Sequence, residues 1–102
     1  MRIISKKRLQ EFWEKWPQAR ASLEHWHKLT EDRTWRQFSE IRTTFNHADV
    51  ATTDNGSPVV IFDIGGNKYR IIAAVHYNTG ICYILRVLTH KEYDLAKWKK
   101  EL

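Results

Sequence analysis

The sequence has few cysteines, which cross-link small folds through disulfides or metal ions, and it has no long apolar run. It has one cysteine, Cys82, so an internal disulfide is impossible, and no Cys or His spacing fits a zinc site. A spanning helix needs about 20 consecutive apolar residues, and no such run exists. Residues 1–6 lack the pattern of a secretory signal. We therefore expect a soluble basic domain from a reducing compartment, with no metal, no cofactor and no membrane association.

What the sequence does have is apolar content and an excess of positive charge. Of 102 residues, 42% are hydrophobic and 13% aromatic, which suits one core, so we expect a single domain over residues 1–102. The net charge is +5, divided as +4 over residues 1–44, −3 over 45–66 and +4 over 67–102. A basic surface favours polyanions such as nucleic acid, and it is equally compatible with an ordinary solvated surface.

Two apolar stripes with helical spacing lie in the first third of the chain. The residues of the two stripes are Leu9, Phe12, Trp13 and Trp16, and then Ala19, Leu23, Trp26 and Leu29. Pro17 separates them, and proline both ends a helix and is well placed to open the next one. The spacing predicts a helical hairpin whose aromatic side chains belong to the core.

The second half of the chain changes to a β-rich pattern. The predicted strands cover residues 59–62, 69–77 and 81–88. Gly65-Gly66 and Asn78-Thr79-Gly80 fit hairpin loops of two and three residues. Residues 46–49 and 54–58 are rich in turn formers, and residues 92–102 predict a short C-terminal helix. Helices followed by an antiparallel meander predict an α+β fold.

The two predicted turns determine which side chains oppose one another. The pairs are Ala73 with Leu85, Val75 with Tyr83, Ile71 with Val87, Ile72 with Arg86, Arg70 with Leu88 and Lys68 with His90. Opposed residues lie about 5 Å apart at Cβ. Lys68, Arg70, Arg86 and His90 should therefore share one open face, with Asp63 opposite Lys68. The other face is apolar and should lie on the helices.

This basic cluster has two interpretations. Arginine and lysine donate to phosphate oxygens, and histidine exchanges protons near neutral pH, so the cluster fits phosphate binding and proton transfer. It also fits a solvated sheet face on which Asp63 neutralises Lys68.

Two motifs about twenty residues apart carry a family resemblance. They are Gly66-Asn67-Lys68-Tyr69-Arg70 and Thr89-His90-Lys91-Glu92-Tyr93-Asp94. Supporting residues in the first half are Trp35, Phe38 and the Phe45-x-x-Ala48-Asp49 segment. Over most of its length the chain resembles the HigB toxin family, within the RelE/ParE superfamily of bacterial toxin–antitoxin systems.

The resemblance implies a fold, an activity and partners. It implies an N-terminal helical hairpin packed on a twisted antiparallel β-sheet. The implied activity is that of a metal-independent mRNA endonuclease acting on ribosome-bound mRNA in the bacterial cytoplasm. The implied partner is a HigA-like antitoxin with a helix-turn-helix domain. This chain has no evident helix-turn-helix, so we expect operator DNA to be bound only through the antitoxin complex.

Metal-free RNA cleavage needs a base, a cation and an acid around one phosphate, and the motif residues can supply them. We expect Arg70 to stabilise the phosphorane, Lys68 to hold the same or a flanking phosphate, and His90 to act as general acid or base. Tyr93 is expected to stack on a base or transfer a proton. The predicted auxiliary RNA-binding residues are Lys91 and Arg86.

One position departs from the family pattern. Family members commonly carry an arginine where this chain has Leu85, and the arginine here is Arg86. Either a bulge re-aims Arg86 to the same site or one basic contact is missing. The alternatives are a non-catalytic RNA- or ribosome-binding module, a gyrase inhibitor of the ParE kind, and a chain that serves mainly as half of a repressor complex.

Overall fold

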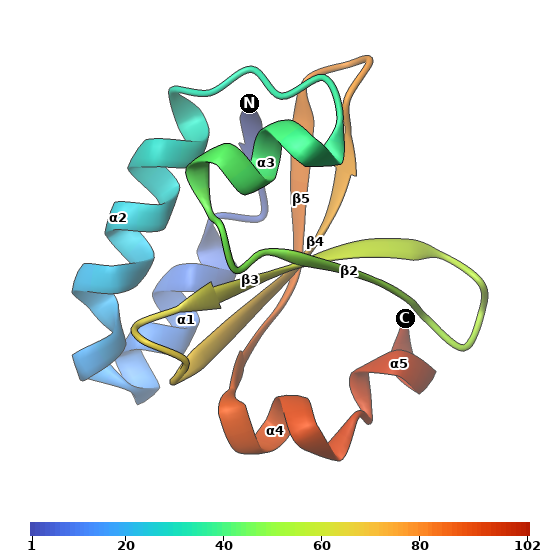
Figure 1. Ribbon diagram of the computed structural model, residues 1–102. Helices are drawn as coiled ribbons and strands as arrows, with labels where there is room; N and C mark the ends of the chain where they lie inside the picture. The colour runs from blue at the N-terminus through green and yellow to red at the C-terminus, as the bar shows by residue number, and fades with distance from the viewer.

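A five-stranded sheet forms the centre of the molecule, and the computed structural model describes all of residues 1–102 (Figure 1). The strands are β1 (Arg2–Ile4), β2 (Asp49–Thr52), β3 (Pro58–Ile64), β4 (Tyr69–His76) and β5 (Ile81–Thr89). Their spatial order is β1-β5-β4-β3-β2, with β1 parallel to β5 and every other pair antiparallel. The sheet is thus mixed at one edge, where a short parallel strand joins the predicted antiparallel meander.

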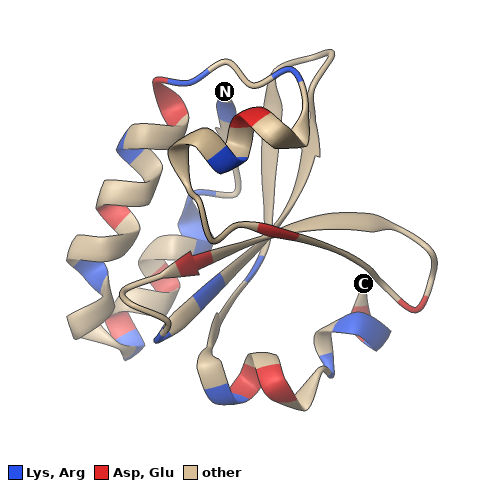
Figure 2. Cartoon of the chain, viewed as in Figure 1, with Lys and Arg blue, Asp and Glu red and all other residues tan.

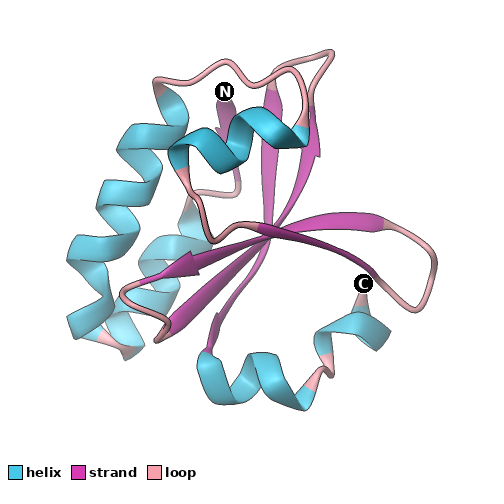
Figure 3. Ribbon diagram, in the orientation of Figure 1, coloured by secondary structure: helices cyan, strands magenta, loops and turns pink.

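Helices cover both faces of this sheet. They are α1 (Lys7–Lys15), the 3₁₀ turn η1 (Pro17–Ala19), α2 (Arg20–Glu31), α3 (Phe38–Thr44), α4 (His90–Leu95) and α5 (Trp98–Glu101). The first three α-helices lie on one side of the sheet and the C-terminal pair on the other (Figures 1 and 3). The predicted α+β class and N-terminal helical hairpin are confirmed. No helix has the length and apolar character needed to cross a bilayer.

The main core lies between the sheet and the N-terminal helices, and Phe62 is at its centre. The ring of Phe62 lies 5.2 Å from Trp26, 5.4 Å from Phe45 and 6.1 Å from Trp35, measured between centroids. Trp26 and Phe62 are fully buried. The aromatic residues of the first half are therefore core residues, as predicted, because edge-to-face packing fills a small core densely.

The opposite face of the sheet is not open, contrary to the sequence prediction. Val59, Ile61 and Ile72 form a second buried cluster there with Trp98 of α5. Trp98 is 2% exposed, and its indole Nε1 donates to the Tyr93 carbonyl at 3.2 Å. Trp98, an aromatic residue in a polar tail, thus covers part of this face, and a binding site can lie only on the part left free.

The C-terminal tail forms two short helices where one was predicted. Thr89 and Glu92 form a reciprocal capping box that starts α4. Ala96, with a φ of 57°, adopts the left-handed conformation and ends it. The break turns the chain so that α5 lies on the second cluster.

The sequence did not predict β2, which begins at Asp49, the last residue of the turn-rich stretch 46–49. β2 pairs with β3 from Asp49 opposite Ile61 to Thr52 opposite Pro58. Its residues are mostly exposed, as an edge strand allows, so they carry no alternating apolar pattern to reveal it.

Both hairpin loops have four residues rather than three and two. His76 pairs with Ile81 across residues 77–80, so Ala73 faces Ile84, and the predicted pairs of Ala73 with Leu85 and Val75 with Tyr83 were wrong. Ile64 pairs with Tyr69 across residues 65–68. The longer loop at residues 77–80 shifts the register of its hairpin by one residue near the turn, and the longer loop at residues 65–68 shifts its hairpin by two residues.

A β-bulge restores the predicted register at the functional end of the β4–β5 hairpin. Leu85 has no partner on β4, and beyond it Ile72 pairs with Arg86 and Arg70 with Leu88, as predicted. Leu85 packs against the second apolar cluster. The bulge that we considered as one explanation for leucine at position 85 and arginine at position 86 is therefore present.

The lone cysteine, Cys82, is a buried β5 residue, as predicted. Burial raises the pKa of its thiol to about 12, opposed by the nearby N-terminal ammonium. Because the pKa is raised on folding, the thiol contributes stability that is lost as the pH rises from the range of an unfolded thiol through about 12.

We expect iodoacetamide at neutral pH to label Cys82 only after urea is added, as measured by intact mass. Equal labelling of folded and unfolded chain would contradict this.

Candidate active site around Arg70 and His90

Arg70 is the centre of a polar cluster on the second face of the sheet, which is the face opposite the N-terminal helices. Its Nη1 donates to Asp63 Oδ1 and to the carbonyls of Asn67 and Tyr69, each at 3.2 Å. Its Nη2 contacts Asn67 Oδ1 and lies 3.4 Å from His90 Nδ1. The Nε–H takes no part in these contacts. The guanidinium is thus a buried cation held by neighbours on three sides.

Asp63 is paired with Arg70 and not with Lys68, which corrects the sequence prediction. The four-residue loop places Asp63 directly opposite Arg70 in the ladder, and their side chains form an ion pair of 3.2 Å. A two-residue loop would have placed Lys68, two positions earlier on the chain, opposite Asp63.

The loop before β4 is built to hold Arg70. Gly65, Gly66 and Asn67 have successive φ values of 65°, 62° and 76°, all in the left-handed region. A Cβ on Gly65 would lie 3.1 Å from the Tyr69 ring, so glycine is required there. Asn67 tolerates this conformation better than most residues, and both its carbonyl and its side chain contact Arg70.

His90 is the first residue of α4, and its ring lies between an arginine and a carboxylate. Its Nδ1 faces Arg70, and its Nε2 lies 3.1 Å from Asp94 Oδ2 one helical turn later. Its backbone N–H donates to the Lys68 carbonyl at 2.9 Å. The side chain is 49% exposed, so a ligand can reach the ring from solvent.

Tyr93 completes the cluster from the middle of α4. The Arg70 Cζ lies 5.2 Å from the centroid of the Tyr93 ring, which in turn stacks on Trp98 at 5.6 Å. Burial raises the pKa of the Tyr93 phenol, as do Asp49 and Asp94, while Arg70 opposes the shift. The phenol is therefore protonated at neutral pH and can donate a proton or a hydrogen bond.

The structure brings together three of the predicted site residues and leaves the other three around them. Arg70, His90 and Tyr93 are in contact. Lys68 and Lys91 are exposed beside them on the loop and on α4. Arg86 on β5 lies opposite Ile72, two residues along β4 from Arg70. Its Nε lies 3.9 Å from Glu101 of α5. Figure 2 shows these basic positions on β4, β5 and the C-terminal helices, with the acidic positions of α4 among them.

Sequence reasoning missed two side chains of this cluster, Asn67 and Asp94. Both belong to the motifs already singled out. The signal for Asp94 was its spacing of four residues from His90, which places both on one face of a helix. The signal for Asn67 was weaker, because its role depends on a left-handed loop that extends beyond the two glycines.

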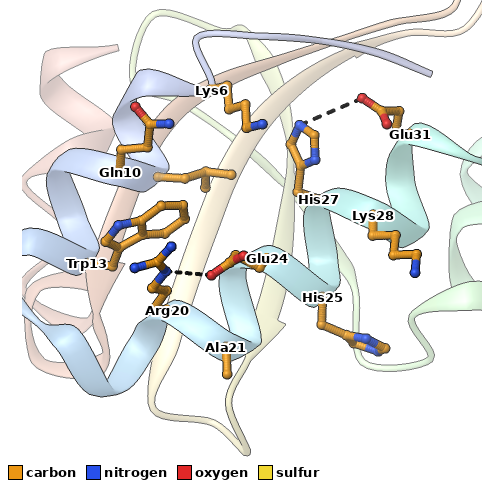
Figure 4. Close-up of a pocket in the computed structure, with 11 residues that line it drawn as sticks. Lys6, Gln10, Trp13, Arg20, Ala21, Glu24, His25, His27, Lys28 and Glu31 are labelled. Atoms are coloured by element: carbon orange, nitrogen blue, oxygen red, sulfur yellow. Dashed lines mark hydrogen bonds and ion pairs between the residues drawn. The ribbon is translucent and has the colours of Figure 1, made fainter.

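A groove lies elsewhere on the molecule, between α1 and α2 (Figure 4). Its volume is about 840 Å³. Along it Arg20 stacks on Trp13 and pairs with Glu24, and His27 lies 4.0 Å from Glu31. Burial lowers the pKa of His27, as does Lys6, while Glu31 opposes the shift. The groove contains none of the motif residues.

The Arg70 cluster has the functional groups for chemistry on a phosphodiester. A fixed guanidinium stabilises negative charge, an imidazole exchanges protons, and a protonated phenol donates one. The flanking lysines add positive charge on the exposed side. Other ionic contacts, such as Arg36 with Glu40, are isolated surface pairs.

Comparisons with known proteins identify a family. The family model described as "HigB_toxin, RelE-like toxic component of a toxin-antitoxin system" matches residues 19–96. The chain is 50% identical over 34 residues to "mRNA interferase toxin HigB" of Escherichia coli (strain K12). The same identity holds for "mRNA interferase HigB" of Escherichia coli O157:H7 and of Shigella flexneri. Each match spans 33% of this chain and 33% of the relative.

Proposed function

The chain belongs to the HigB toxin family of RelE-like toxic components of toxin–antitoxin systems, and from this membership we propose that it is an mRNA endonuclease. The observation that carries the proposal is the contact of Arg70 with both His90 and Tyr93, which links the two family motifs at one point. The names of the E. coli and Shigella relatives support the choice of mRNA as substrate.

The proposed reaction is metal-independent transesterification within the RNA chain. A base removes the proton of a ribose 2′-hydroxyl, and the 2′-oxygen forms a bond to the adjacent phosphorus. The bond from phosphorus to the 5′-oxygen breaks, and that oxygen takes a proton from an acid. The products are a 2′,3′-cyclic phosphate and a 5′-hydroxyl, so the protons balance between one base and one acid.

Each motif residue has a role in this scheme. The charge of Arg70 and its free Nε–H stabilise the phosphorane. His90 is a proton-transfer group because its ring is half exposed beside that cation. Tyr93 is the proton donor, since its phenol stays protonated. Lys68, Lys91 and Arg86 bind flanking phosphates, with Arg86 exchanging Glu101 for RNA.

The proposed partners follow from the family. A HigA-like helix-turn-helix antitoxin neutralises the chain in the bacterial cytoplasm, and operator DNA is bound through that complex. The substrate is mRNA on the ribosome, which supplies the alignment that this shallow site does not provide by itself.

The decisive test is mapping of 5′ ends on a reporter mRNA in a purified translation system, with and without ribosomes. New ends at in-frame codons only with ribosomes would support the proposal. Ends without ribosomes would keep the nuclease and remove the ribosome requirement. No new ends in either case would overturn it.

A second candidate function is RNA binding without cleavage, favoured by Leu85. This side chain replaces a common arginine, and Arg86 faces Glu101 of α5. Toxin that blocks translation without new 5′ ends would support this candidate. Loss of DNA supercoiling by gyrase in its presence would instead indicate the ParE kind of activity.

Replacing Tyr93 with phenylalanine should lower the cleavage rate by roughly 10- to 100-fold, at or below the lower limit for a positioned acid. Phenylalanine keeps the stacking on Trp98 and the contact with Arg70, and only the proton donor is lost. Water replaces it in part because the site is open. Single-turnover cleavage on programmed ribosomes measures the effect, and Tyr83→Phe, at an exposed β5 position, is the control. Equal loss in both variants would contradict the role.

A further inference from the structure

We propose that Asp94 is a positioning residue that holds His90 as the Nε2–H tautomer, so that Nδ1 is the nitrogen that takes the 2′-hydroxyl proton. The catalytic part of this inference rests on the proposed function. The tautomer itself depends only on the contacts of the His90 ring.

The two contacts of the ring select the same tautomer. Arginine N–H groups only donate, so the contact of Arg70 Nη2 with His90 Nδ1 at 3.4 Å requires Nδ1 to accept. In neutral imidazole the proton then lies on Nε2. That N–H points at Asp94 Oδ2, 3.1 Å away, and a carboxylate is its natural acceptor. Neither contact would be a hydrogen bond in the other tautomer.

Helix α4 fixes the distance between the two residues. His90 and Asp94 are four residues apart, which puts their side chains on one face of the helix. The Thr89–Glu92 capping box holds the first turn, and Ala96 ends the helix two residues after Asp94. Glu92 is occupied by the cap, so Asp94 is the carboxylate of α4 that is available to the ring.

The charges around the ring assign a direction to the proton transfer. In the Nε2–H tautomer Nδ1 carries the lone pair, which is what a general base needs. Asp94 compensates the imidazolium that forms when Nδ1 takes the proton. The Asp63 carboxylate is paired with Arg70 and faces the guanidinium. Both His90 and Asp94 are about half exposed, so Asp94 acts by orientation more than by a large Coulomb energy.

The tautomer can be measured without any cleavage assay, by ¹⁵N NMR of the imidazole nitrogens in the purified chain. Wild type should show the pattern of Nε2–H for His90. Asp94→Asn should lower the Nε2–H fraction, because an amide accepts from Nε2–H more weakly than a carboxylate and can instead donate to Nε2. A wild-type ring that is not mainly Nε2–H, or a ring unaffected by Asp94→Asn, would overturn the inference even if the chain cleaves RNA.

Kinetics test the catalytic part. Asp94→Asn should lower kcat by roughly 10- to 100-fold, as loss of a partner that orients a functional histidine does. KM should stay the same or fall, since a negative charge near RNA is removed, and Asp94→Glu should recover part of kcat. The control is Glu24→Gln, which removes a carboxylate from another i,i+4 ion pair on α2.

The outcomes separate this inference from the proposed function. A shifted tautomer with unchanged kcat would overturn the catalytic role of Asp94 and leave the nuclease intact. A wild-type chain that cuts no RNA would overturn the proposed function and with it the catalytic part, while the NMR result would still decide the tautomer. Equal loss of kcat in Asp94→Asn and Glu24→Gln would reduce the effect to general destabilisation and overturn the positioning role.

Discussion

Alanine at position 90 should lower the rate of mRNA cleavage by roughly 10²- to 10⁴-fold, the range for losing a positioned acid or base. The imidazole is the group in the cluster that can both accept and release a proton at neutral pH. Its removal leaves Arg70 in place, because Asp63 and Asn67 still hold the guanidinium. RNA binding should therefore change much less than the cleavage step, as measured by single-turnover cleavage at saturating toxin.

The matched control is alanine at His25, which is exposed on α2, on the other side of the sheet. Both variants lose one exposed histidine, so the net charge is affected alike. His25→Ala should cleave at the wild-type rate. If His90→Ala did so as well, His90 would have no catalytic role, and its motif position would reflect only the start of α4.

Much of the fold could be predicted from sequence because its signals are local. The apolar stripes around Trp13 and Trp26 have helical spacing, and the strands of the meander are rich in β-branched residues. β2 carried no such signal, because an exposed edge strand buries too little to show a pattern. Trp98 had no visible partner in sequence, so the covering of the second sheet face by α5 could not be predicted.

The neighbours of each site residue could be predicted from sequence only where the register of the two hairpins was predicted correctly. The loop at residues 77–80 is one residue longer than assumed, and the bulge at Leu85 cancels this error before the functional end. Arg70 and His90 therefore meet as predicted. No bulge cancels the error at the other hairpin, so Asp63 pairs with Arg70 instead of Lys68. Loop length is decided by backbone conformation at Asn67, which composition alone does not determine.

These corrections change what Arg70 is expected to do. An arginine opposite leucine on an open face would be a mobile phosphate ligand. The arginine found here is 9% exposed, with its Nη atoms bound to Asp63, Asn67 and His90. It can place a fixed positive charge beside the reacting phosphate without reorganising, which is the arrangement that stabilises a transition state most effectively. Arg70 also stabilises the fold through these contacts, so any substitution should change both the cleavage rate and the free energy of unfolding.

Replacing Arg70 with methionine should therefore reduce both cleavage and stability. Cleavage should fall by roughly 10²- to 10³-fold, as when a preorganised donor to a developing anion is removed. The free energy of unfolding should fall by about 1–3 kcal/mol, because Asp63 keeps its charge without its partner. Asp63 is 23% exposed, so water limits the cost to less than that of a fully buried ion. Ribosome-programmed cleavage and urea unfolding measure the two effects.

The double variant Asp63→Asn with Arg70→Met separates the two effects. Removing the unpaired carboxylate should recover most of the lost stability, since broken buried pairs are costly mainly through the charge that remains. Cleavage should stay low, because the cation is still missing beside His90. Arg36→Met, at an exposed arginine paired with Glu40, should change neither quantity. Recovery of cleavage together with stability would mean that Arg70 acts only through the fold, and the phosphorane would then need its charge from Lys68 or Lys91.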